Sequence, residues 1–248
     1  MRVSFDRDEV EDWDSYPFSI PVIGSFEGLE IASRVLFFVG ENGSGKSTLL
    51  EALALACGFG PEGGSRNFRF STREEERDEW IADEPIVKLA AALRLSWRGT
   101  KQRDGFFLRA ESFYNVATYL DRLGGQALEP YGGISLHERS HGESFLALFL
   151  ERFSGAGLYL LDEPEAALST ARQLALLARM HDLLAADPQA QFLIATHSPI
   201  LLAFPGAQIC SFDGVAIHPI DYRQTDAYLL TRRFIDDPER ALRELFES

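Results

Sequence analysis

The chain has few cysteines and lacks long apolar runs and heptad repeats, and each of these shortages argues against a particular class of protein. It has two cysteines in 248 residues, Cys57 and Cys210, each in an apolar stretch, which favours core thiols over a metal site or a redox pair. No apolar stretch approaches the roughly 18 residues of a membrane span, and the first residues contain no apolar signal region. No heptad run is long enough for a coiled-coil arm. We therefore expect a cytoplasmic chain without a membrane segment.

Basic residues are scarce relative to acidic ones. Lys and Arg number 24 against 38 Asp and Glu, so the formal net charge is −14 at pH 7. A non-specific nucleic-acid binder favours a basic surface, because contacts with phosphate dominate that affinity. The net charge therefore gives no support to nucleic-acid binding, which would need a local basic face.

Residues 40–48 carry the pattern G-x-x-x-x-G-K-[ST] directly after the apolar run of residues 35–39. A strand, a glycine-rich loop and a helix in this order place backbone N–H groups and a helix N-terminus around phosphate. Lys46 then reaches the terminal phosphates and the Ser47 hydroxyl ligates Mg²⁺. We expect nucleotide contacts from Gly40, Glu41, Asn42, Gly43, Ser44, Gly45, Lys46, Ser47 and Thr48.

Two further apolar runs end in polar residues. One is followed by Asp162 and Glu163, and the other leads to His197. The carboxyl ends of buried parallel strands meet at one edge of a sheet, where nucleotide sites of open α/β sheets lie. We expect Asp162 to hold Mg²⁺, Glu163 to orient or deprotonate the attacking water, and His197 to contact the γ-phosphate or position water.

A fourth motif, Ser140-His141-Gly142-Glu143, precedes an apolar helix. The four motifs in this order, over roughly residues 34–204, resemble the ATP-binding-cassette (ABC) ATPases. The fourth motif is similar to their signature Ser-Gly-Gly-Gln/Glu, with His141 in place of the first glycine. Glutamate at the fourth place of the motif, Glu143, is similar to the chromosome-maintenance and recombination-repair branch of the family. That branch includes small bacterial "predicted ATPase" (AAA family ATPase) proteins.

This resemblance implies an ATP site that two copies share head to tail. Ser140, Gly142 and Glu143 of one copy would complete the phosphate loop of the other, and residues 165–169 would cross the interface. The family usually has a glutamine that contacts Mg²⁺ after an antiparallel strand. Here the predicted strand of residues 106–109 leads instead to Glu111, which we expect to ligate the metal or to cap a helix. Gln102 is the other candidate, at the tip of a hairpin predicted between residues 86–97 and 105–109.

The pattern of elements predicts an α/β P-loop NTPase fold with a mostly parallel sheet core, an antiparallel β subdomain and a small helical lobe. We expect a single ABC-type ATPase domain over residues 1–248, with its core in about 1–110 and 156–248 and the signature lobe in about 111–155. Residues 170–184 predict a long amphipathic helix, and the tail predicts a small hairpin and one or two helices. Near the N-terminus, Trp13, Tyr16 and Phe18 either stack on adenine or pack in the core.

These observations predict an Mg²⁺-dependent protein that binds and hydrolyses ATP as an ATP-gated homodimer, in DNA repair, maintenance or defence. It would take ATP and Mg²⁺, with an unidentified protein partner. One alternative is the nucleotide-binding subunit of an ABC transporter. The other is a low-turnover, ATP-gated scaffold or DNA-binding module.

Overall fold

The computed structural model describes residues 1–61, 63–65, 84–97, 99, 102, 104–109, 153 and 155–247. Within them lie a seven-stranded sheet and a three-stranded sheet. The larger has the strand order β10-β9-β3-β8-β7-β6-β4. Its strands are β3 (Val35–Val39), β4 (Gly64–Ser65), β6 (Asp104–Arg109), β7 (Gly157–Asp162), β8 (Gln191–Ala195), β9 (Gln208–Ser211) and β10 (His218–Pro219).

The five inner strands of the large sheet are parallel, and the edge strands β4 and β10 run antiparallel to their neighbours. The small sheet is antiparallel, in the order β2-β1-β5. Its strands are β1 (Arg2–Phe5), β2 (Gly28–Glu30) and β5 (Leu93–Ser96). The predicted α/β P-loop fold, with a mostly parallel sheet and an antiparallel subdomain, is therefore confirmed.

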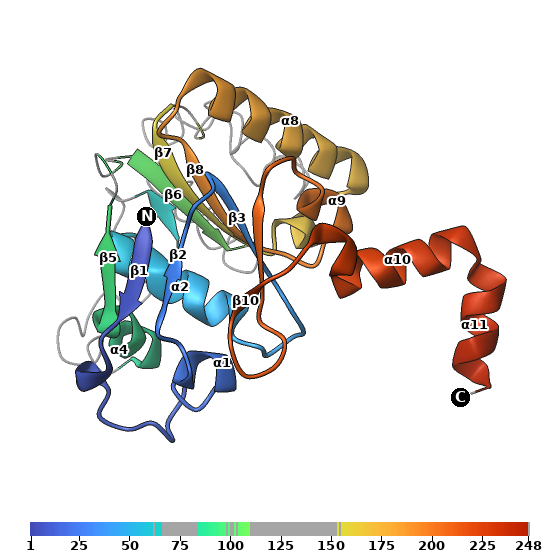
Figure 1. Cartoon of the computed structure of the whole chain (residues 1–248). Coiled ribbons are helices and arrows are strands. Elements are labelled where there is room, and N and C mark those ends of the chain that lie inside the picture. Colours follow the sequence, from blue (N-terminus) through green and yellow to red (C-terminus); the bar gives the residue numbers. More distant parts are fainter. Residues whose placement is uncertain are drawn as a thin grey trace, which may run out of the picture.

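Helices cover both faces of the large sheet (Figure 1). The longest are α2 (Lys46–Cys57) on one face and α8 (Thr170–Ala186) on the other. The remaining helical elements of the described chain are shorter. They are η1 (Arg7–Glu9), α1 (Pro21–Gly24), α4 (Pro85–Ala92), η4 (Pro164–Ala167), α9 (Pro199–Leu202), η5 (Tyr222–Gln224), α10 (Asp226–Asp236) and α11 (Pro238–Phe246).

Alternation along the strands creates two cores. In β3, Val35, Phe37 and Val39 pack with α8 and α9, whereas Leu36 and Phe38 pack with α2 and the small sheet. Because successive strand residues point to opposite faces, an apolar run without polar interruptions fits a strand that is covered on both sides. Cys57 and Cys210 are buried and free, as the sequence predicted.

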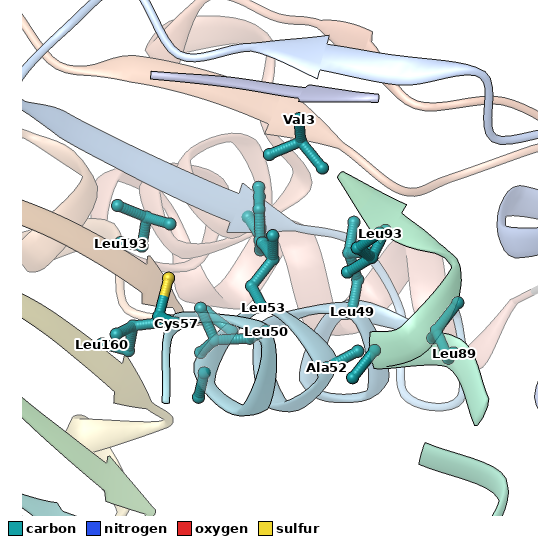
Figure 2. Close-up of a cluster of buried hydrophobic side chains, with 14 of the residues drawn as sticks. Val3, Leu49, Leu50, Ala52, Leu53, Cys57, Leu89, Leu93, Leu160 and Leu193 are labelled. Carbon is teal, nitrogen blue, oxygen red and sulfur yellow. The ribbon is translucent and has the colours of Figure 1, made fainter. Parts of the chain in front are cut away.

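Helix α2 lies between the large sheet and the small sheet (Figure 2). Its Leu49, Leu50 and Leu53 are fully buried, together with Val3 of β1 and Leu89 of α4. Both sides of the helix are apolar for this reason. The packing fixes the N-terminus of α2, and with it the loop of residues 40–48, against the sheet.

The hairpin predicted from residues 86–97 and 105–109 is wrong. Residues 85–92 form helix α4, whose Leu89, Ala90 and Ala92 are buried. Strand β5 then pairs with β1, and β6 pairs with β7 and β4. Proline at the first helical position and an Ala/Leu-rich sequence favour a helix, and they outweigh the β-branched Ile86 and Val87.

The long helix predicted after residue 169 is confirmed, as are the two helices of the tail, α10 and α11. The small hairpin predicted within the tail is wrong, because β10 is the one described strand there and it pairs with β9, which comes before the tail. The expected signature lobe, residues 111–155, lies almost entirely outside the described residues. No described helix has the length and apolar character needed to cross a membrane.

Candidate functional site

The carboxyl ends of five parallel strands gather the polar residues of the site at one edge of the sheet. Strand β3 leads into the loop of residues 40–48, β7 ends at Asp162, and β8 leads to His197. Register pairs Asp162 with Ala195 and Arg109 with Asp162. The edge predicted from separate motifs is therefore a single place in the structure.

The loop of residues 40–48 wraps closely around the N-terminus of α2. Gly45 caps the helix at φ 100°, without a side chain that could occupy the first N–H groups. A Cβ atom at Gly45 would lie 3.2 Å from Ile20 and Val22 side-chain carbons. The first turn of α2 thus leaves its N–H groups for an anion, which is the arrangement that phosphate requires.

Lys46 is the buried cation of this loop. Its side chain is only 4% exposed, and Nζ donates to the carbonyl oxygens of Gly40 at 2.7 Å and Glu41 at 2.8 Å. Burial lowers the pKa of Lys46, and the nearby carboxylates oppose that effect; they belong to Glu163, Asp213, Asp162 and Glu165. These four carboxylates outnumber the cations near them, Lys46 and Arg109, so the local charge is negative.

Ser47 and Asp162 join the loop to the acidic strand end. The Ser47 hydroxyl donates to Asp162 Oδ1 at 2.7 Å, and Asp162 is 8% exposed. Arg109 approaches the other oxygen of Asp162 at 3.9 Å and pairs with Glu51 of α2 at 3.1 Å. A hydroxyl oxygen beside a carboxylate oxygen is a suitable donor pair for Mg²⁺, so the two residues fit the predicted metal site.

Glu163 and His197 stand together on the solvent side of Asp162. His197 Nε2 lies 3.7 Å from Glu163 Oε1, and both side chains are about two-fifths exposed, at 41% and 42%. Glu163 has φ 48°, the one positive φ of a non-glycine residue in the described part of the chain. Its N–H donates to Ala195 O at 2.9 Å, which holds this unfavourable backbone in place.

Two carboxylates of the site were not predicted from the sequence. Asp213 follows β9 and accepts from the Glu41 N–H at 2.9 Å. Glu165, which the sequence placed only in an interface loop, accepts from the His197 N–H at 2.5 Å. Asp213 had the same signal as Asp162, an acidic residue after a buried apolar strand, whereas nothing in the sequence connects Glu165 with residue 197.

The aromatic residues near the N-terminus separate into core and surface. Phe18 is buried, and the Trp13 ring packs against Phe5 and Phe18 beneath the guanidinium of Arg7. Tyr16 is 53% exposed, and its hydroxyl lies 3.3 Å from the Thr48 hydroxyl. Of the three aromatic candidates for adenine, Tyr16 is thus the one beside the phosphate loop.

Some predicted site residues remain without a test. Glu111, Ser140, Gly142 and Glu143 lie outside the described residues. Gln102, the alternative metal-contacting residue, is buried and donates to the carbonyl of Gln189, which precedes β8. It therefore lies at the amino ends of the strands, opposite the phosphate loop, and is not part of this site.

A cavity of about 530 Å³ opens beside the phosphate loop. Gly40, Glu41 and His197 line one side of it. The opposite side comes from the end of β10, from η5 and from α10. The described residues therefore leave space next to the loop.

Residues 18–121 match the AAA domain family (AAA_23) in a comparison with known protein families. No curated protein sequence matches the chain significantly. Among solved structures, the SMC head domain from Thermotoga maritima is 16% identical, with a TM-score of 0.41 and coverage of 78% of this chain and 93% of that one. The ATP-binding subunit of an ABC transporter is 17% identical, with a TM-score of 0.37 and coverage of 89% and 90%.

RNase-L Inhibitor is 18% identical, with a TM-score of 0.42, and the match covers 85% of this chain and 38% of that protein. At these scores the three solved structures carry no argument about function.

Proposed function

We propose that this chain, of which residues 18–121 match the AAA domain family, binds ATP with Mg²⁺ and hydrolyses it within a head-to-tail dimer. The observation that carries the proposal is the 2.7 Å hydrogen bond from Ser47 to Asp162. It brings the phosphate loop and the acidic strand end to one point, where a metal-bound triphosphate needs both. A buried lysine and an open carboxylate–histidine pair stand next to it.

The charge of the site supports Mg²⁺ as part of the substrate complex. Lys46 is one cation among the carboxylates of Asp162, Glu163, Glu165 and Asp213. Free ATP would add further negative charge to this cluster, so a divalent cation is needed for balance. Mg²⁺ would supply charge neutralisation of the β- and γ-phosphates, with Ser47 and Asp162 as the residues that hold it. Glu111 is proposed as a further ligand.

The residues of this chain divide the work on ATP. Lys46 would leave the carbonyl oxygens of Gly40 and Glu41 and donate to the terminal phosphates. The N–H groups at the start of α2 would bind the β-phosphate, and Tyr16 would stack on the adenine. These contacts position the nucleotide, which is most of what phosphoryl transfer requires.

Glu163 is proposed as the general base for the attacking water. Its strained backbone turns the carboxylate out of the strand end, and His197 lies within reach of it and of the expected γ-phosphate. Glu165 holds the backbone of His197 and thereby orients the imidazole. A water between these groups would lose a proton to Glu163 as its oxygen bonds to the γ-phosphorus. The bond from that phosphorus to the bridging oxygen would break, and ADP would leave.

The second copy would close the site. Ser140, Gly142 and Glu143 would approach the γ-phosphate from the partner, at a helix N-terminus that stabilises negative charge. ATP binding would then bring two copies together and hydrolysis would separate their nucleotide faces.

The test is Glu163→Gln. The amide keeps the size of the side chain and can orient water but cannot accept the proton. We expect unchanged MgATP affinity by calorimetry and a loss of phosphate release on the order of 10²–10⁴-fold. Glu239→Gln, on exposed α11, is the matched control and should hydrolyse at the wild-type rate. Wild-type turnover in Glu163→Gln would contradict the assignment and make Glu111 the next candidate.

A further inference from the structure

Helices α10 and α11 form an arm that extends away from the two sheets (Figure 1). The base of the arm is anchored, because Tyr222 Oη donates to Pro199 O at 3.0 Å. The Tyr222 ring also packs at a tilt against the ring of Tyr228, with centroids 4.8 Å apart. Beyond Tyr228, residues 229–240 are all exposed. Among the described residues of the arm, this run of twelve is therefore open to solvent.

The sequence of the arm nevertheless has the amphipathic pattern of helices that bury one face against another surface. Apolar residues recur in α10 at 227, 230, 234 and 235, and in α11 at 241, 242, 245 and 246. This spacing places them along one stripe of each helix. The exposed large members are Leu230, Phe234, Ile235, Leu242, Leu245 and Phe246, of which Phe246 is 78% exposed.

The size of this surface is that of an interface. An aromatic side chain has about 150–250 Å² of surface and a Leu or Ile side chain has somewhat less, so six that are about half exposed present roughly 500 Å². That value lies at the upper end of the roughly 300–600 Å² for the largest apolar patch of a typical monomer. It is also close to the apolar share of the about 800 Å² that each partner contributes to a stable interface.

Charge decides which class of partner fits. Residues 226–247 contain six acidic and four basic side chains, in a chain of formal charge −14. A nucleic acid or an anionic membrane would be repelled, since both need a basic excess. Many charged side chains of the arm pair with one another. The ion pairs join Arg232 to Asp236, Arg240 to Glu244, and Arg233 to Glu244.

An apolar stripe bordered by both signs of charge is complementary to a second copy of itself. A two-fold axis brings the same patch of both chains together, which requires this kind of self-complementary surface. The arm also begins on the nucleotide side, because Ala227, Leu230 and Thr231 line the cavity that Gly40 and His197 border. Two chains joined by their arms would hold their nucleotide faces near each other.

We propose that the arm is a dimerisation element, in which α10 and α11 of two copies pack against each other without nucleotide. This goes beyond the ATP-gated contact proposed above, because the arms keep the chains together in both the open and the closed state. Such a tether raises the effective concentration of one nucleotide face at the other to roughly the millimolar range.

The experiment measures the mass of the full chain by light scattering in the absence of nucleotide. We expect the mass of two chains for the wild type and of one chain for Ile235→Glu/Leu245→Glu. The control, Glu239→Gln/Arg243→Gln, changes two exposed polar residues of the same arm and should remain a dimer. Thermal unfolding and MgATP affinity should be unchanged in both variants, and the single variant Leu245→Glu tests the same contact if the double variant fails to fold.

A wild-type monomer without nucleotide, or an apolar-face variant that remains dimeric, would overturn the proposal. Binding of the wild type to phosphatidylserine vesicles or duplex DNA through the arm, with no dimer, would do so as well. Failure of the ATP-gated contact leaves this result untouched, since no nucleotide is present in the measurement.

Discussion

Lys46 is a charged group in a place that penalises charge. Burial lowers its pKa, and the carboxylates of Glu163, Asp213, Asp162 and Glu165 only partly restore it. The proposed contact of the ammonium with the phosphates of ATP would offset this cost. Lys46→Ala should therefore abolish MgATP binding, since no other cation lies in the loop.

The pH dependence of ATP binding follows from the same shift. Binding needs the protonated ammonium, so MgATP affinity should fall by up to about ten-fold per pH unit above the lowered pKa of Lys46. This loss should begin at lower pH than ordinary lysine titration. Calorimetry from neutral to alkaline pH measures it, and an affinity that stays constant until ordinary lysines titrate would contradict the assignment.

The free energy of unfolding should rise with pH over the range in which MgATP affinity falls. Between the lowered folded pKa and the ordinary unfolded value, the unfolded chain binds more protons at residue 46. The free energy of unfolding therefore gains from this group as pH rises. Below the folded pKa both states are protonated, and the buried charge retains its full cost.

Asp213 has a role that its charge alone would not suggest. Its Oδ1 accepts from the Glu41 N–H and its Oδ2 accepts from Ser211, so it fixes the first turn of the phosphate loop. Asp213→Ala should weaken MgATP binding several-fold, because a hydrogen bond of this kind contributes about 1 kcal/mol.

Asp213→Asn is the matched comparison for that prediction. It removes the same negative charge but keeps an oxygen for the Glu41 N–H, so its MgATP affinity should equal or exceed that of the wild type. If Ala and Asn weaken binding equally in a titration, the carboxylate acts through its charge and the loop contact is unimportant.

At the scale of elements, what could be predicted from the sequence depended on local signals. The loop of residues 40–48, the strand ending at Asp162 and the helix after residue 169 each contain their own start and stop residues. The edge where they meet followed from parallel pairing alone. The predicted hairpin failed because β5 pairs with β1, whose residues lie 88 to 94 positions earlier in the chain, and no local pattern encodes such a partner.

The same reasoning explains which site residues were missed. Glu165 reaches the backbone of His197 across two strand ends, and only the fold brings them together. Tyr16, which is proposed to stack on adenine, could not be chosen from three aromatic residues of similar character. Trp13 and Phe18 are removed from the choice by their packing with Phe5, which only the fold shows.

Helix α2 connects stability with the site, because its buried side holds the phosphate loop in place. Leu53 is fully buried between the two sheets (Figure 2). Leu53→Ala should lower the free energy of unfolding by about 2–5 kcal/mol, from lost burial and the cavity that remains. Denaturant unfolding measures the change.

Leu174→Ala on α8 is the control for that measurement. It removes the same atoms from a side chain that is 56% exposed, and surface changes of this kind usually stay within about 0.5 kcal/mol. An equally small effect of Leu53→Ala would mean that α2 does not depend on the packing described here.

At the scale of the whole molecule, the described residues line one side of the expected triphosphate site. These are the phosphate loop, Asp162, Glu163 and His197, and a cavity lies beside His197. Site completion by a second copy would make hydrolysis dependent on two chains. A contact through the arms that forms without nucleotide would keep the second copy close to the first.

The head-to-tail arrangement makes a prediction that no single-chain mechanism shares. Ser140 belongs to the segment outside the described residues and is proposed to serve the partner's ATP. Ser140→Arg should leave ATP binding by its own phosphate loop intact and stop hydrolysis, because a bulky cation would clash with the opposing loop. Lys46→Ala should be inactive for the separate reason that it binds no ATP.

Co-expression of the two variants with different tags allows the mixed dimer to be purified. Head-to-tail geometry places both lesions in one composite site and leaves the other with an intact loop and an intact signature. The mixed dimer should therefore hydrolyse ATP, although each variant alone does not, and phosphate release per bound ATP measures it. Inactivity with one ATP bound and closed in by the partner would mean that both sites must act together. Inactivity without any ATP-dependent closure would contradict the contribution of Ser140 to the partner's site.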